Sequence, residues 1–211
     1  MNYMQDVTKV HAVIFDIDGT LLQSDAADDR YISSAIREVL GNVKLRPSWG
    51  MYTQFTSVGI LTEILGDNSL DATSERLAAV RDSFVAHVGR HVTEIGPFEE
   101  VPGARAFVQS LHDSASHRIA YATGGWYAAA KLKLSTSNFP MESIPLATSD
   151  DHVGRQEIML HALRQLGGPF ETVSYYGDGS WDVVAAKALG WKFVPVGRKL
   201  GGLTSYDPGS F

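Results

Sequence analysis

The chain has 211 residues, enough for one domain or for one domain with a modest insertion. Hydrophobic residues make up 44% and charged residues 20%, which excludes a disordered or fibrous chain. The net charge of −6 opposes non-specific binding to nucleic acid or to an anionic membrane, and the absence of cysteine excludes disulfides and thiolate metal sites. The apolar runs are too short for a signal peptide or a membrane span, so we expect a cytoplasmic protein.

Five short apolar runs rich in β-forming residues predict buried strands of a parallel sheet. They cover residues 10–15, 118–123, 144–148, 172–177 and 192–197. Between the later runs lie stretches with apolar residues at helical spacing: one that opens at Pro102-Gly103, then 156–166 and 181–189. Strands that alternate with helices form right-handed βαβ units. The fold class is therefore predicted to be α/β, with a doubly wound parallel sheet.

Residues 24–97 break this alternation, because their apolar residues have helical spacing throughout. Helices are predicted over 29–40, 55–65 and 74–88. We expect a core domain of residues 1–22 and 98–211, and an inserted small α-helical cap domain of residues 23–97. Ligands of such sheets bind at the carboxyl ends of the strands, where a cap would cover the site.

The strongest chemical signal is FDIDGTLL, at the end of the first predicted strand. Asp16 and Asp18 repel each other unless a cation or a shared proton lies between them. A hard divalent ion with oxygen ligands, such as Mg²⁺, would relieve that repulsion and could also hold a phosphate. Asp-Gly alone is ordinary turn chemistry, but paired aspartates after a buried strand favour a site.

A second acidic motif, YYGDGSWD, follows the fourth predicted strand. Asp178 ends that strand, and Asp182 lies one turn into the next helix, so both side chains could face the same edge of the sheet. An aspartate near a helix N-terminus is often only structural. Together with Asp16 and Asp18, however, the motif favours a metal site.

Two weaker signals concern phosphate. Thr123 and Gly124 follow the second predicted strand, where a hydroxyl and glycine N–H groups at a helix N-terminus would cradle a phosphate. Arg155, just ahead of the helix at 156–166, could neutralise phosphate oxygens. Lys131 and Lys133, on the helix after Thr123, are alternative candidates for this cation.

These motifs together resemble the haloacid dehalogenase-like (HAD) hydrolase superfamily, over nearly the whole chain. DIDGT, ATGG, GRQEI and GDGSWD occur in the family's order, each after the expected kind of element. The resemblance implies a Rossmann-like core, and the inserted helical cap makes the chain most similar to the phosphoglycolate phosphatase and β-phosphoglucomutase type. Many relatives carry Lys-Pro where this chain has Arg155-Gln156.

By resemblance, Asp16 is the nucleophile that forms an aspartyl-phosphate, and Asp18 is the general acid and then the base. Thr123 and the Gly124 N–H bind the phosphoryl group, and Arg155 balances its charge. The residues implied to hold Mg²⁺ are Asp16, Asp18 through its carbonyl, Asp178 and, through water or by orienting a ligand, Asp182. Phosphoryl transfer requires mainly positioning and charge neutralisation, which these groups would supply.

The predicted function is Mg²⁺-dependent hydrolysis of a small phosphorylated metabolite by a monomer or homodimer. A phosphomutase shares all four motifs and stays open as an alternative. A dehalogenase needs neither Mg²⁺ nor an acid at Asp18, and a catalytically dead binding module would not need every motif residue. The substrate is not indicated, although cap residues 52–54, 56 and 57, together with Trp126 and Tyr127, are candidates to face it.

Overall fold

A computed structural model describes residues 9–207 of the chain. Its centre is a five-stranded parallel sheet with the strand order β3-β2-β1-β4-β5. The strands are β1 (His11–Phe15), β2 (His117–Ala122), β3 (Leu146–Ala147), β4 (Thr172–Gly177) and β5 (Lys192–Pro195). All five predicted strands are present. The expected strand at 144–148 is shorter than predicted, because the Thr148 N–H turns away to the carboxylate of Asp151.

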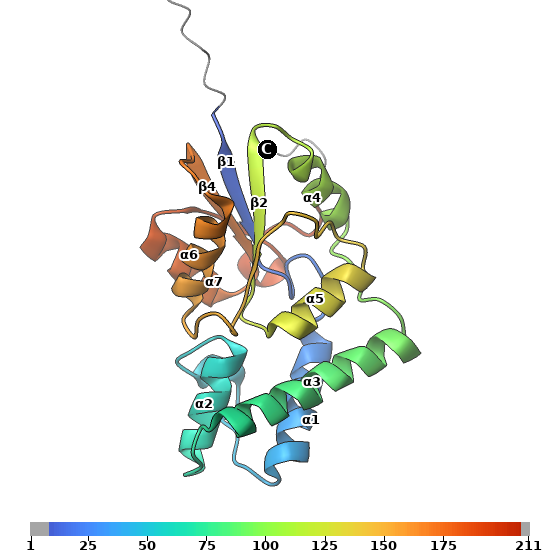
Figure 1. Ribbon diagram of the computed structural model, residues 1–211, viewed down its shortest axis with the longest axis vertical. Helices are drawn as coiled ribbons and strands as arrows, with labels where there is room; N and C mark the ends of the chain where they lie inside the picture. Colours follow the sequence, from blue (N-terminus) through green and yellow to red (C-terminus); the bar gives the residue numbers. More distant parts are fainter. Residues whose placement is uncertain (1–8, 208–211) are drawn as a thin grey trace, which may run out of the picture.

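Helices cover both faces of the sheet, as a doubly wound fold requires (Figure 1). Neighbouring residues of a strand point to opposite faces, so Phe15 packs with Phe107 of α4 (Ala104–His112), whereas Ile14 packs with α6 (Arg155–Leu166) and α7 (Ser180–Leu189). Helix α5 (Tyr127–Thr136) contributes Ala129, Ala130 and Leu134 to the Phe15 side. The predicted α/β fold class is confirmed.

Three inserted helices follow β1 and lie beyond the carboxyl ends of the strands (Figure 1). They are α1 (Asp25–Leu40), α2 (Ser57–Asp67) and α3 (Ser74–Glu94), with a short 3-10 turn, η1 (Trp49–Met51), between the first two. The domain boundaries at residues 22/23 and 97/98 stay a prediction. No helix of residues 9–207 is long and apolar enough to cross a membrane.

The bounds of the inserted helices differ from those predicted. Helix α1 begins at Asp25 rather than at residue 29, and α3 continues past residue 88 to Glu94. Helix α2 begins at Ser57 because the Thr56 hydroxyl accepts the Gly59 N–H and caps it. Phe55, expected inside that helix, therefore lies in the preceding loop.

Residues 55–57 connect the inserted helices to the core. The Ser57 N–H donates to the Gly124 carbonyl over 2.7 Å, and the Thr56 hydroxyl donates to the Val153 carbonyl over 2.7 Å. The Phe55 ring stacks on Trp181 of α7, with a centroid distance of 4.9 Å. These three contacts place the insertion directly over the strand ends that carry the acidic motifs.

Candidate active site

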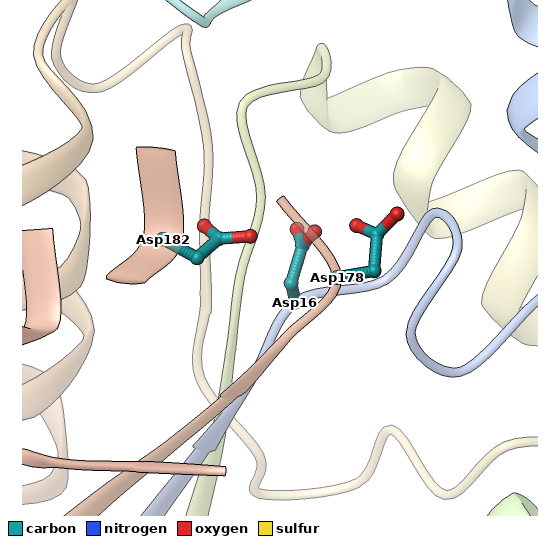
Figure 2. Close-up of side chains that lie close together, drawn as sticks. All are labelled: Asp16, Asp178 and Asp182. Carbon is teal, nitrogen blue, oxygen red and sulfur yellow. The ribbon is translucent and has the colours of Figure 1, made fainter. Parts of the chain in front are cut away.

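Three polar residues directly follow the carboxyl ends of three adjacent strands. Asp16 follows β1, Thr123 follows β2 and Asp178 follows β4. Because β1 lies between β2 and β4, these side chains meet at one edge of the sheet. Asp182, in the first turn of α7, joins them, and its carboxylate points toward Asp16 (Figure 2). Two motifs more than 160 residues apart are thereby brought together.

Asp16, Asp178 and Asp182 form a compact group of carboxylates, with one oxygen of each within 4.8 Å of the others. Burial and the neighbouring aspartates raise the pKa of Asp16, although Arg155 opposes the shift. Burial, Asp25 and Asp182 raise the pKa of Asp178 to about 7. Arg155 therefore does not offset the full cost of burying these carboxylates side by side.

The arrangement fits a hard divalent cation. One oxygen of Asp16, Oδ1, is buried and has no hydrogen-bond partner among the described residues. Carboxylate oxygens are the ligands that Mg²⁺ prefers, and a cation among them would offset both the burial and the mutual repulsion that raise the two pKa values. The predicted metal residues Asp16, Asp178 and Asp182 thus lie together, while the role of the Asp18 carbonyl stays a prediction.

Arg155 supplies the positive charge at this cluster. It is the first residue of α6 rather than a residue ahead of the helix, because Gly154 is the N-cap. Its Nη2 lies 3.1 Å from Asp16 Oδ2 and 2.7 Å from Asp182 Oδ1. Burial alone would lower the pKa of Arg155, but the two carboxylates raise it, so the guanidinium stays charged.

Asp182 is fully buried and already has partners for both oxygens. Oδ1 accepts from Arg155 Nε over 2.7 Å, and Oδ2 accepts from the Gly179 N–H over 3.1 Å. The second of these bonds closes the first turn of α7. This carboxylate therefore orients Arg155, and its predicted role at the metal, through water or by orienting a ligand, stays a prediction.

Asp18 is set apart from the three carboxylates. Its Oδ1 accepts from Lys133 Nζ over 2.7 Å and also from the Ser24 hydroxyl. Burial would raise the pKa of Asp18, but the charge of Lys133 and these hydrogen bonds outweigh burial and lower it. One of the two lysines considered as the phosphate cation is therefore a partner of Asp18, whereas Lys131 is exposed beside the Tyr127 ring.

Asp28 of α1 is a residue of the site that sequence reasoning missed. It pairs with the same Lys133 ammonium group that Asp18 binds. Burial and the charge of Asp18 raise the pKa of Asp28 to about 8, because two carboxylates share one ammonium group. Asp28 gave no sequence signal because acidic residues in the first turn of a helix are common for reasons of helix stability.

The predicted phosphate cradle lies beside Asp16. The Thr123 side chain is buried, and its Oγ1 accepts the Gly125 N–H over 3.1 Å. A Cβ at Gly124 would lie 2.7 Å from the Phe55 carbonyl oxygen and 2.9 Å from Arg155 Nη1, so this position requires glycine. The helix begins only at Tyr127, whose N–H donates to Asp150, so the cradle is a loop rather than the helix N-terminus that was expected.

A cavity of about 450 Å³ lies between these residues and the inserted helices. This volume falls within the range of small-molecule sites, roughly 300–1,000 Å³. Of the residues predicted to face the substrate, Thr56, Ser57 and Trp126 line the cavity. Residues 52–54 and Tyr127 do not, since Tyr52 packs under Arg46 inside the insertion and Tyr127 is exposed.

The comparisons with known proteins agree with this architecture. The haloacid dehalogenase-like hydrolase family matches residues 10–190, so the chain belongs to that family of hydrolases. Comparison with curated proteins gives no significant match.

Several solved structures share the fold. A hydrolase from Pseudomonas syringae has a TM-score of 0.70 and 22% identity, covering 87% of this chain and 83% of its own. A variant of CbbY from Rhodobacter sphaeroides, in complex with xylulose-(1,5)bisphosphate, has a TM-score of 0.68 and 20% identity, covering 95% and 91%. β-Phosphoglucomutase from Clostridium difficile has a TM-score of 0.68 and 16% identity, covering 89% and 85%. At these identities the similarity establishes the fold.

Proposed function

We propose that the chain is a Mg²⁺-dependent phosphatase that hydrolyses a small phosphate monoester through an aspartyl-phosphate at Asp16. The observation that carries this proposal is the free, buried Oδ1 of Asp16, at a strand end beside Arg155 and within a group of three carboxylates. A carboxylate nucleophile next to a fixed cation is the arrangement that phosphoryl transfer requires.

In the first half-reaction, an Asp16 oxygen bonds to phosphorus and the ester P–O bond breaks. Asp18 in its protonated form, which its lowered pKa makes the minor form, would give its proton to the departing oxygen. Thr123 and the Gly124 N–H hold the phosphoryl oxygens, and Arg155 balances their charge, since its guanidinium already faces Asp16. The alcohol then leaves, and Asp16 carries the phosphoryl group.

In the second half-reaction, water attacks the phosphorus of the aspartyl-phosphate and gives a proton to Asp18. The bond to Asp16 breaks, and inorganic phosphate and the free carboxylate result. Lys133 keeps Asp18 deprotonated by lowering its pKa, which suits the base role. The same effect makes Asp18 a reluctant acid, so the first half-reaction should depend strongly on how good the leaving group is.

Asp16 and Asp178, with the Asp18 carbonyl, would hold Mg²⁺. Asp182 would orient Arg155 and, through it, the groups around the ion. The ion would supply charge stabilisation to the phosphoryl group. A dehalogenase is disfavoured because that chemistry leaves Asp18 and the three-carboxylate group without a purpose. A dead binding module is disfavoured because every motif residue retains its reactive group.

The test is hydrolysis of p-nitrophenyl phosphate by the wild type, with and without Mg²⁺, followed by borohydride trapping. We expect turnover that EDTA abolishes, and a reduced residue at position 16 identified by mass spectrometry. Asp16→Asn should be inactive and never labelled. Asp18→Asn, the matched control, should be slow but still form the phospho-enzyme with this good leaving group. Label on Asp18, or turnover in Asp16→Asn, would contradict the proposal.

A further inference from the structure

The cavity beside Asp16 has two different walls. The core wall holds Asp16, Asp18, Asp178, Thr123 and Arg155. The opposite wall is formed by the insertion and is mainly apolar, with Ile32 of α1, Trp49, Phe55, Ile60 of α2 and Phe84 of α3 among its lining residues. Trp126 and Trp181 extend this apolar surface from the core side. The leaving group of a phosphate ester held at Asp16 would lie against this surface.

The charged groups that the inserted helices add to the cavity are all acidic. Within the described chain, Asp25, Asp28 and Asp29 of α1 line it, and no lysine or arginine of α1, α2 or α3 does. A second phosphate or a carboxylate on the leaving group would therefore meet Asp25, Asp29 and apolar side chains on this wall rather than a cation. Burying an unpaired anion there is costly.

The cations that line the cavity all come from the core and already have partners. Arg155 pairs with Asp16 and Asp182, and Lys133, only 2% exposed, pairs with Asp18 and Asp28. Lys199 is 76% exposed and lies 3.4 Å from Asp25. Of these, Arg155 is the one at the predicted phosphate position and Lys133 lies between two carboxylates, so among the described residues no buried cation remains for a second anionic group.

Resting on the proposed function, we infer that the substrate is a phosphate monoester whose leaving group is uncharged and largely apolar, with no second anionic group. Asp28 Oδ1, buried in the same cavity without a hydrogen-bond partner among the described residues, would form a hydrogen bond with a neutral polar group on that leaving group. This class excludes sugar bisphosphates. It therefore disfavours a phosphomutase, because returning a phosphoryl group from Asp16 to a sugar phosphate produces a doubly phosphorylated sugar.

The test compares two esters of the same shape and the same kind of leaving oxygen. These are para-carbamoylbenzyl phosphate, which is neutral beyond its phosphate, and para-carboxybenzyl phosphate. We expect kcat/KM for the amide to exceed that for the acid by roughly tenfold or more, since like charges at close range in a cavity cost at least this much. The corresponding phosphonates should inhibit competitively in the same order.

Two variants locate the effect in the insertion. Ile32→Lys, which adds a cation to the apolar wall, should raise the relative rate of the acid. Asp29→Asn, which removes one negative charge from the cavity, should narrow the difference in kcat/KM between the amide and the acid. The control Asp71→Asn, at an exposed aspartate outside the cavity, should leave that difference unchanged. The Lys199 side chain could instead turn inward and pair with the carboxylate of the acid ester. In that case Lys199→Met would slow hydrolysis of the acid ester and not of the amide.

The outcomes separate the two proposals. Equal or faster hydrolysis of the acid, or rapid interconversion of a hexose 1-phosphate primed with a hexose bisphosphate, would overturn the inference and leave Asp16 chemistry intact. Selective slowing of the acid by Lys199→Met would overturn it as well. No hydrolysis of either ester or of p-nitrophenyl phosphate, despite selective binding of the neutral phosphonate, would instead overturn the proposed phosphatase and support the cavity's selectivity.

Discussion

Lys133 Nζ lies 2.7 Å from Asp18 Oδ1, although the lysine is on α5 and the aspartate follows β1. The same ammonium also pairs with Asp28 of the inserted helix α1. One buried cation therefore joins the proposed acid and base to the insertion. Arg155 has the corresponding position between Asp16 and Asp182. Each of the two aspartates of the first motif has its own buried cation.

Lys133→Met tests the energetic role of that cation. We expect the free energy of unfolding to fall by up to about 3 kcal/mol, because two carboxylates that are only 22% and 20% exposed lose their shared partner. The double variant Lys133→Met, Asp28→Asn should recover part of this loss, since it removes one of the stranded charges. Urea unfolding at pH 7 measures both. Equal stability of the single and double variants would show that the loss of Lys133 leaves no costly charge on Asp28.

Arg155→Met tests which cation balances the phosphoryl charge. We expect kcat/KM to fall by roughly 10²–10³-fold, because phosphoryl charge is left uncompensated in a closed site. Arg155→Lys should retain part of the activity, since it keeps a charge but loses the two-point contact. Lys131→Met serves as the control on an exposed lysine and should be near wild type. The assignment is wrong if Lys131→Met is the variant that loses activity and Arg155→Met is not.

Removal of Mg²⁺ should make stability depend on pH in an unusual direction. The pKa of Asp178 is raised to about 7, so the folded state binds a proton that the unfolded state has already lost above about pH 4. The contribution of this proton to the free energy of unfolding is fully present below the unfolded pKa. It declines as the pH rises toward 7, by at most about 4 kcal/mol. Asp28, with its pKa raised to about 8, should extend the decline.

Chemical denaturation in EDTA between pH 5 and pH 8 measures this slope. Asp178→Asn should flatten it, because the amide does not titrate. Saturating Mg²⁺ at pH 8 should restore stability, by about 2.7 kcal/mol at one hundred times the dissociation constant. A stability profile in EDTA that rises from pH 5 to pH 8, with no response to Mg²⁺, would contradict the proposed metal group.

Adjacent glycines provide a matched test of how the insertion is seated. Gly124→Ala places a methyl group 2.7 Å from the Phe55 carbonyl and 2.9 Å from Arg155, so it should displace both the linking segment and the guanidinium. We expect kcat/KM to fall roughly tenfold or more, since misplacement by about 1 Å is costly. At Gly125 the nearest contact would be 3.5 Å, to Thr123 Oγ1, so Gly125→Ala should be nearly neutral. Equal losses of kcat/KM in the two variants would argue against close packing of the Phe55 carbonyl and Arg155 around Gly124.

The sequence predicted the sheet and the position of its polar edge because both follow from local patterns. Apolar runs mark the strands, and a residue that directly follows a strand, such as Asp16 or Asp178, must lie at the carboxyl edge. Order along the chain does not show which strands are neighbours, but the motif resemblance supplied that. The proximity of Asp16, Asp178 and Arg155 was therefore foreseeable.

The Lys133–Asp28 pair was not foreseeable from the sequence. The two residues are 105 positions apart, and they meet only because the insertion folds back over α5. Neither residue has a local pattern that distinguishes it from a solvated charge. The helix bounds at Asp25 and Glu94 were missed for a related reason. Tertiary packing stabilises helical turns outside the stretch in which apolar residues recur at helical spacing.

The Lys133–Asp28 pair sets a condition on engineering the enzyme's specificity. The apolar wall of the cavity belongs to the insertion, so exchanging that segment for another helical module is a direct way to change which esters are accepted. The exchange would also remove Asp28, and the buried ammonium would then have Asp18 as its one remaining carboxylate partner among the described residues. A transplanted module should therefore keep an acidic side chain at position 28, even when every other residue facing the substrate is replaced.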